Sequence, residues 1–157
     1  MRSAWIAPAF CLVLLAACGQ RNISDPGNLL LAPEDFPGIA VSVLAMSGEQ
    51  SLDRPSALVE LQGPGFRVLQ TLVVFQSREH ALAALDGIRA DLVSRGEAGL
   101  GEVEASGIFE HPLGEDEAAS LFFIESNGLV RLTVTGPDRR RQLAELADVA
   151  RKKLSDG

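Results

Sequence analysis

Hydrophobic and polar residues along this chain follow two different periods, and each period predicts one kind of secondary structure. Segments in which apolar residues alternate with polar ones, or form short runs bounded by turn residues, are typical of β-strands. The strands predicted on this basis cover residues 39–46, 57–62, 66–76, 104–111, 120–125 and 129–135. Glycine-containing turns at 63–65 and 126–128 separate the second strand from the third and the fifth from the sixth, so each of these pairs is expected to form a hairpin.

The third and sixth of these strands differ in the faces that they are expected to present. Residues 72–75 are apolar on both faces, which indicates a central strand covered on both sides. In the sixth strand, Arg131, Thr133 and Thr135 alternate with apolar residues. Because an antiparallel sheet often exposes one face, we expect the side of the sheet with these three residues to be wet.

Two segments have the 3.6-residue apolar period of amphipathic helices. The first covers residues 78–95, with Ser77 as its N-cap and Gly96 as the glycine that ends it. The second runs from Pro137 through Leu154. Their apolar stripes consist of Ala81, Leu85, Ile88 and Leu92 in the first helix and of Leu143, Leu146, Ala147, Ala150 and Leu154 in the second. Each helix is therefore expected to bury one face against the strands.

The predicted elements assemble into an α+β fold, with one antiparallel sheet and two helices packed on it. A hairpin followed by a helix occurs at 57–95 and again at 120–154. This recurrence has two explanations, a duplicated ββα unit or the chance alignment of two amphipathic helices that follow hairpins, and the sequence favours neither. The order of the elements loosely resembles small extracytoplasmic lipoprotein domains of the PsbP-like kind.

The N-terminus has the layout of a secretory signal peptide. Arg2 supplies a positive charge, residues 4–17 are apolar or small, and polar residues follow from Gln20. The apolar run is shorter than the roughly 20 residues that a spanning helix needs. A removed leader is therefore predicted rather than a transmembrane anchor.

The segment Leu15-Ala16-Ala17-Cys18, where the leader ends, is similar to the lipobox of bacterial lipoproteins. The resemblance implies cleavage between Ala17 and Cys18, a thioether-linked diacylglycerol on the Cys18 thiol and often an acyl chain such as palmitate on the new α-amine. Several acyl chains together anchor a protein stably to a membrane. The alternative is an ordinary signal peptide with a chance cysteine. Gly19 stands where an aspartate commonly marks inner-membrane retention, which resembles an outer-membrane lipoprotein facing the periplasm.

On this basis the chain divides into a signal peptide (residues 1–17), a lipidated tether (18–28) and a single domain (29–157). The chain has two cysteines, of which Cys11 belongs to the leader and Cys18 to the lipid site. No disulfide is therefore expected within the mature protein, although its compartment would permit one. The domain must be stable from packing alone.

Charge and composition disfavour two classes of ligand. The chain has 14 basic residues, one of which (Arg2) lies in the leader, against 21 acidic residues. This acidity argues against nucleic acid, whose recognition uses basic surfaces. Tyrosine is absent and the single tryptophan, Trp5, lies in the leader. Glycan binding is disfavoured as well, because sugar sites typically stack on tyrosine or tryptophan rings.

His111 lies near a run of carboxylates and is the first candidate for chemistry. With Glu115 and Asp116 it offers nitrogen and oxygen ligands to a metal ion. Calcium loops space their oxygens at alternate positions around a glycine turn, and this run does not, so a solvated turn is the competing interpretation. His80 is interpreted as an exposed surface histidine. The mature sequence has no nucleophile elbow and no phosphate-binding glycine motif, so no cofactor is predicted.

Arg139, Arg140 and Arg141 form the second candidate, in the first turn of the last predicted helix. The helix dipole disfavours positive charge there by roughly a few tenths of a kcal/mol for each residue. A run that opposes this local preference can mark a site for an anion or an acidic partner protein. The alternative is a solvated face that balances the net negative charge of the domain.

These features support three functional hypotheses. The first is a lipid-anchored, non-enzymatic envelope protein that binds a partner protein or a small apolar ligand near the membrane. The second is a small metal-dependent envelope hydrolase that uses His111, Glu115 and Asp116. The third is a scaffold or sensor domain whose exposed sheet face pairs with another chain.

Replacement of Cys18 by serine tests the predicted address. Because a hydroxyl cannot replace the thiol in the thioether, Cys18→Ser is expected to lose its lipid and to keep its leader. Metabolic labelling with radioactive palmitate and N-terminal sequencing measure both effects. A labelled serine variant, or a mature wild-type protein that begins at a residue other than Cys18, would contradict the lipobox interpretation.

Overall fold

The structure is a computed structural model of the 157-residue chain, and it describes residues 22–50, 54–95 and 107–156. Its strands are β1 (Ser42–Glu49), β2 (Ser56–Gly63), β3 (Phe66–Val74), β4 (Ile108–Leu113), β5 (Asp116–Glu125) and β6 (Gly128–Thr135). Its helices are α1 (Arg78–Arg95), α2 (Arg139–Asp156) and the 3₁₀ turns η1 (Gly27–Leu29) and η2 (Pro33–Asp35). None of the helices in these ranges has both the length and the apolar character that crossing a bilayer requires. The predicted leader, Cys18 and Gly96 lie outside the described residues.

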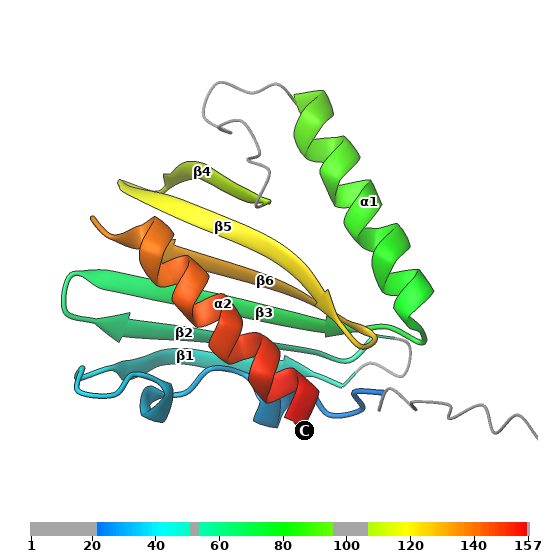
Figure 1. Ribbon diagram of the computed structural model, residues 1–157, viewed down its shortest axis with the longest axis horizontal. Helices are drawn as coiled ribbons and strands as arrows, with labels where there is room; N and C mark the ends of the chain where they lie inside the picture. Colours follow the sequence, from blue (N-terminus) through cyan, green and yellow to red (C-terminus); the bar gives the residue numbers. More distant parts are fainter. Residues whose placement is uncertain (1–21, 51–53, 96–106, 157) are drawn as a thin grey trace, which may run out of the picture.

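The strands form one antiparallel sheet in the order β1-β2-β3-β6-β5-β4 (Figure 1). β3 pairs with β6 along its length, with Val68 opposite Val134 and Gln70 opposite Leu132. This pair joins the β2–β3 hairpin to the β5–β6 hairpin, the two hairpins that the glycine turns predict. The predicted α+β fold, an antiparallel sheet with two helices packed on it, is confirmed, and β3 has the central place expected for it.

The two edge strands lie later in the chain than the sequence predicts. β1 begins at Ser42 rather than at residue 39, because residues 36–39 still form a turn in which the Ile39 N–H donates to the Phe36 carbonyl at 3.1 Å. β4 begins at residue 108 rather than 104 and directly follows Gly107, which has a left-handed φ of 78°. In each case a turn precedes the edge strand, so the strand begins at a later residue than predicted.

Helix α2 covers one face of the sheet and closes the main hydrophobic core. Every residue of its predicted apolar stripe is buried. The sheet contributes side chains without exposed surface from four strands: Val59, Leu61, Val68, Leu72, Val130, Leu132 and Val134, together with Ala119. Burial of a valine or leucine side chain stabilises a fold by about 1.5–3 kcal/mol relative to exposure, so this face carries the main hydrophobic stabilisation.

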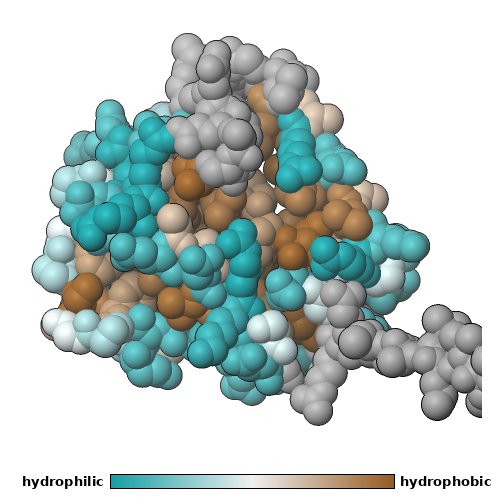
Figure 2. Space-filling model, viewed as in Figure 1, coloured by the Kyte–Doolittle hydropathy of each residue, from teal (hydrophilic) through white to brown (hydrophobic). Residues whose placement is uncertain are grey.

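Helix α1 lies against the opposite face and packs only through its first half. Ser77 caps it as predicted, since the Ser77 Oγ accepts a hydrogen bond from the backbone N–H three residues later at 3.3 Å. Ala81 and Leu85 are buried outside the core cluster that contains α2, whereas Ile88 and Leu92 are only half-buried. Figure 1 shows the helix diverging from the sheet, and Figure 2 shows apolar surface where the two separate. The helix and the sheet therefore enclose an open angle.

The N-terminal segment fills the part of the α2 face that lies over β2 and β3. Its buried residues Ile23, Leu30, Leu31 and Phe36 belong to the core. The Leu31 N–H donates to the buried Gln70 Oε1 at 2.7 Å. The predicted tether, residues 18–28, therefore lies partly inside the fold, because Ile23 already packs in the core.

The recurrence of a hairpin and a helix, which the sequence shows, extends in the structure to a third strand in each half. Each half of the described chain holds three strands and a helix, β1-β2-β3-α1 and β4-β5-β6-α2. A two-fold axis through the β3–β6 pair would leave both helices on one face, yet α1 and α2 lie on opposite faces. The N-terminal segment occupies the place on the α2 face that an equivalent α1 would need, which is the physical reason for the difference.

Asn127, in the β5–β6 turn, holds the start of the N-terminal segment. Its Oδ1 accepts from the Ile23 N–H at 2.7 Å. Its Nδ2 donates to the Ile23 carbonyl at 3.2 Å and to the Phe75 carbonyl at 2.6 Å. One buried side chain thus ties together the start of the described chain, the β5–β6 turn and the end of β3.

The expectation that one side of β6 is wet is wrong for two of its three residues. Thr133 and Thr135 are buried, and only Arg131 is partly exposed. The Thr133 hydroxyl lies 2.6 Å from the Ser120 hydroxyl, and the Thr135 hydroxyl accepts from the Arg67 N–H at 3.1 Å. Neighbouring strands supply these partners, so the hydroxyls can be buried without an unsatisfied group.

Replacement of Asn127 by alanine tests its role as a tie. The change leaves the polar atoms of Ile23 and Phe75 without partners in a buried place, so the free energy of unfolding is expected to fall by about 2–4 kcal/mol. Urea denaturation of the mature domain, followed by circular dichroism, measures the effect. The control is Asn28→Ala, because Asn28 is exposed and its contact with Asp25 is 3.5 Å long. Equal losses in the two variants would contradict the assigned role.

Candidate ligand-binding pocket beneath helix α1

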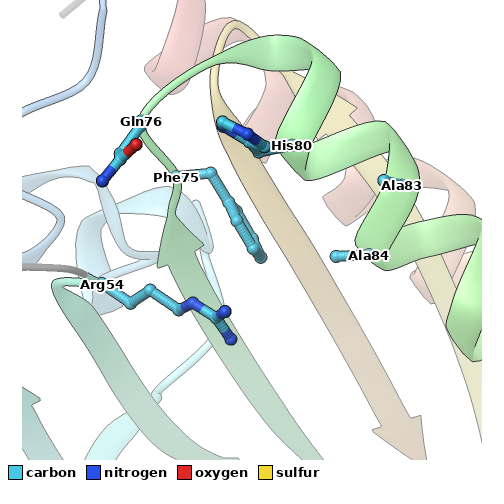
Figure 3. A pocket seen from close by; sticks show the side chains of 6 residues that line it. All are labelled: Arg54, Phe75, Gln76, His80, Ala83 and Ala84. Atoms are coloured by element: carbon cyan, nitrogen blue, oxygen red, sulfur yellow. The ribbon is translucent and has the colours of Figure 1, made fainter.

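A pocket of about 560 Å³ lies between the first turns of α1 and the sheet face opposite α2 (Figure 3). Its lining residues come from three consecutive parts of the fold: Arg54 before β2, Phe75 and Gln76 after β3, and His80, Ala83 and Ala84 on α1. Pockets for small molecules commonly have volumes of about 300–1,000 Å³. The volume is therefore suited to a small ligand.

The pocket exists because large side chains on the sheet meet small ones on the helix. Ser56 pairs with Val73, so antiparallel register brings Arg54 beside Phe75 at the end of the strands. The Arg54 guanidinium carbon lies 5.7 Å from the centre of the Phe75 ring, within the range of a cation–π contact. Figure 3 shows both side chains directed toward α1, where Ala83 and Ala84 leave space.

The lining carries positive charge without a compensating carboxylate. Within the described ranges, Arg54 forms no ion pair, and none of the lining residues is acidic. Several other arginines in the described ranges do pair with a carboxylate: Arg67, Arg89, Arg139, Arg141 and Arg151. The guanidinium of Arg54 is therefore available to an anionic ligand, and the Phe75 ring beside it offers apolar contact.

His80 adds a second polar group at the mouth of the pocket. Its Nδ1 lies 3.2 Å from the Ser77 Oγ, which orients the ring. Its other ring nitrogen has no hydrogen-bond partner among the described residues. The prediction of an exposed histidine is consistent with this placement, but the sequence did not indicate that the ring lines a pocket.

Arg131 is a second arginine on the same sheet face without a carboxylate partner in the described part of the chain. Its guanidinium carbon lies 5.6 Å from the centre of the Phe122 ring, and its Nε is buried without a hydrogen-bond partner. Burial lowers the pKa of Arg131 from its ordinary value, because desolvation penalises the charged form. The face beneath α1 thus carries two guanidinium groups that stack on rings and have no carboxylate partner among the described residues.

The residues of the predicted metal site are not brought together. The His111 Nδ1 lies 2.9 Å from the Pro112 carbonyl, and its Nε2 lies 2.8 Å from the Ser120 Oγ. Asp116 pairs instead with Arg67 of β3, at 2.7 Å. Glu115 is exposed at that turn. The described residues contain no group of three or more histidine, cysteine, aspartate or glutamate side chains able to hold a metal ion.

The contact between His111 and Ser120 has the chemical form of a base and a nucleophile. A carbonyl can only accept, so His111 donates from Nδ1 to Pro112, and its Nε2 accepts from the Ser120 hydroxyl. The Ser120 oxygen then accepts from Thr133. Ser120 has no exposed surface, however, so a substrate cannot reach it in this structure. The chain of hydroxyls satisfies buried polar groups between β4, β5 and β6.

The arginine run at the start of α2 is divided among partners. The Arg139 Nη2 lies 2.7 Å from Glu117 and 3.1 Å from Glu110, so it ties the helix to β4 and β5. Arg141 pairs with Asp138 at 3.1 Å within its own helix turn. Arg140 also has an interaction of its own. Binding of an anion or a partner protein by the run stays a prediction, and such a ligand would compete with these contacts.

Comparison with known proteins identifies a similar fold but no family. No protein-family model and no curated protein matches the sequence. The crystal structure of the extracellular domain of PknH from Mycobacterium tuberculosis is similar, with a TM-score of 0.63 and 12% sequence identity over 85% of this chain and 100% of that chain. At this identity the likeness shows the fold alone. The fold of this chain therefore also occurs in an extracellular domain.

Replacement of Arg139 and of Arg141 tests whether the first has a structural role that the second lacks. Arg139→Gln leaves Glu110 and Glu117 close together beside a half-buried helix start, so it is expected to lower the free energy of unfolding by about 1–2 kcal/mol. Arg141→Gln removes exposed pairs and is expected to change it by less than about 0.5 kcal/mol. Urea denaturation of both variants at low salt makes the comparison. A larger loss for Arg141→Gln would contradict a structural role for Arg139.

Proposed function

We propose that this chain is a lipid-anchored, extracytoplasmic domain without enzymatic activity, which binds a small anionic ligand with an apolar portion in the pocket beneath α1. The observation that carries the proposal is the Arg54 guanidinium, stacked on Phe75 and without a carboxylate partner in the described ranges. An unpaired cation beside an aromatic ring and two alanines matches a ligand with a negative group and an apolar body.

The extracytoplasmic address is supported by the sequence and by the fold. The lipobox-like residues 15–18 imply a lipid on Cys18, and Gly19 fits an outer-membrane lipoprotein that faces the periplasm. A fold that is shared with an extracellular domain is compatible with this address.

A binding role is supported by the groups that line the pocket. A guanidinium, an imidazole and an amide can hold an anion by hydrogen bonds and charge, and the lining residues that the structure describes include no serine, threonine, cysteine or carboxylate that could act as a nucleophile. Two of the described hydroxyls contact a histidine ring. That of Ser120 is buried elsewhere in the sheet, and that of Ser77 caps α1, where it accepts a hydrogen bond from the His80 backbone N–H.

The mature chain offers a direct spectroscopic test because it lacks tryptophan and tyrosine once the leader is removed. Phe75→Trp places a single fluorophore in the pocket and keeps an aromatic ring beneath Arg54. Decanoate, an anion with an apolar tail, is expected to change its fluorescence saturably. Decanol, which has the same tail and no charge, is expected to bind more weakly.

Arg54→Gln in the Phe75→Trp background tests the anion contact. A charge-assisted hydrogen bond contributes about 1.5–3 kcal/mol, so the dissociation constant for decanoate is expected to rise at least about tenfold. The matched control is Arg89→Gln, because Arg89 is exposed on α1 outside the described pocket lining and pairs with Asp86. Equal binding of decanoate and decanol, or an equal effect of the two arginine variants, would contradict the proposal.

A further inference from the structure

We infer that the lipid anchor holds the pocket end of the domain against the membrane, so that the ligand of the pocket is an anionic lipid taken from the bilayer. The inference rests on the proposed function, because it requires the lipid on Cys18 and the pocket beneath α1. Its support comes from the length of chain between Cys18 and the first docked residue, and from the position of that residue in the fold.

The chain between the lipid site and the fold is short. Ile23 is buried and its N–H donates to the Asn127 Oδ1 at 2.7 Å, so the folded part has begun by this residue. Four residues, 19–22, separate it from Cys18. Five residue steps span at most about 18 Å when fully extended. Ile23 is therefore confined to a thin layer next to the membrane surface that holds the acyl chains.

The pocket lies at the same end of the sheet as Ile23. The Asn127 side chain bonds both Ile23 and the carbonyl of Phe75, which lines the pocket. Arg78, in the first turn of α1, donates to the Ser126 carbonyl at 3.4 Å. Figure 1 shows the start of the described chain, the β5–β6 turn, the start of α1 and the end of α2 gathered at this end. We call it the anchor end.

The opposite end of the sheet lies far from the membrane in this arrangement. The turn between β4 and β5, at residues 114–115, is separated from the β5–β6 turn by the ten residues of β5. A strand of this length spans about 30 Å. This separation exceeds the roughly 18 Å that the fully extended tether spans. The two ends of the sheet therefore lie at different distances from the bilayer.

Because the tether is short, a weak affinity of the pocket for a membrane lipid is sufficient for binding. A ligand site held next to a surface experiences a high effective concentration of the molecules in that surface, commonly in the millimolar range for short linkers. The chain is acidic overall, with a formal net charge of −7, so the anchor rather than the net charge supplies the proximity. An anionic lipid offers Arg54 and His80 a negative headgroup and offers Phe75 an apolar chain.

The first experiment measures the orientation of the lipidated protein in vesicles. The Cys18 thiol is consumed by the thioether, so a single engineered cysteine can carry a fluorescent label. Glu79→Cys marks the anchor end and Glu115→Cys marks the far end, and both positions are exposed. Quenching by headgroup-spin-labelled lipid is expected to be at least about threefold stronger at residue 79, because the positions are separated by about 30 Å along the sheet. Equal quenching at the two positions would overturn the orientation.

A longer tether provides the control for the first experiment. An insertion of about 16 glycine and serine residues after Gln20 adds a flexible segment with a root-mean-square span of roughly 20 Å. The difference between the two labels is expected to shrink in this variant. A difference that is unchanged would mean that a surface contact, rather than the tether, sets the orientation, and it would overturn the tether as the cause.

The second experiment identifies the source of the ligand. The lipidated Phe75→Trp protein is placed in vesicles that contain either brominated phosphatidylglycerol, which is anionic, or brominated phosphatidylcholine, which is zwitterionic. Quenching of the tryptophan is expected to be stronger with the anionic lipid and to fall at least about tenfold in apparent affinity with Arg54→Gln, while Arg89→Gln leaves it unchanged. Inorganic phosphate, added at equal concentration, is expected not to displace the lipid.

The outcomes separate this inference from the proposed function. If neither brominated lipid quenches the tryptophan while decanoate still binds in solution, the bilayer is not the source of the ligand and the pocket function stands. Displacement by phosphate would likewise assign the site to a free anion and overturn the lipid source. If decanoate also fails to bind, the proposed function itself is wrong.

Discussion

The backbone pairing of β3 with β6 is the interaction on which the rest of the structure depends. Val68 lies opposite Val134 although α1 and two strands separate them along the chain. An isolated hairpin is at best marginally stable in water. This pair joins two hairpins into one sheet, and a helix can pack on each of its two faces. It also brings the β5–β6 turn to the end of β3, where Asn127 can bond Phe75 and Ile23 together. Both the core and the pocket depend on this register of β3 and β6.

The unequal cover of the two sheet faces produces the candidate site. α2 and the N-terminal segment close one face with apolar side chains. α1 closes only part of the other, because its later stripe residues leave the sheet. On that less covered face, Arg54 and Arg131 stack on phenylalanine rings and have no carboxylate partner among the described residues. An acidic protein thus keeps positive charge at a hollow surface, where an anion can reach it.

The sequence predicted the elements more closely than the site. The helix expected at 78–95 coincides with α1, because a cap and an apolar stripe are local signals. Arg54 and Phe75 carry no local signal, since they become neighbours only through the register of β2 and β3. His111 was expected beside the carboxylates that follow it, but the pleat of β4 directs it to Ser120 on the neighbouring strand. Side-chain partners across a sheet are set by register, which a period-two pattern does not specify.

By itself, the sequence determined the two kinds of element with their approximate bounds, and it predicts the address of the protein, because each of these depends on residues close together in the chain. The tertiary structure decided which faces the helices cover, how early the folded part begins and which of the described arginines have no carboxylate partner. Those properties depend on contacts between distant segments, such as Ile23 with Asn127 and Arg54 with Phe75. Such contacts form only when the packing of the whole sheet selects one arrangement among the many that the local pattern permits.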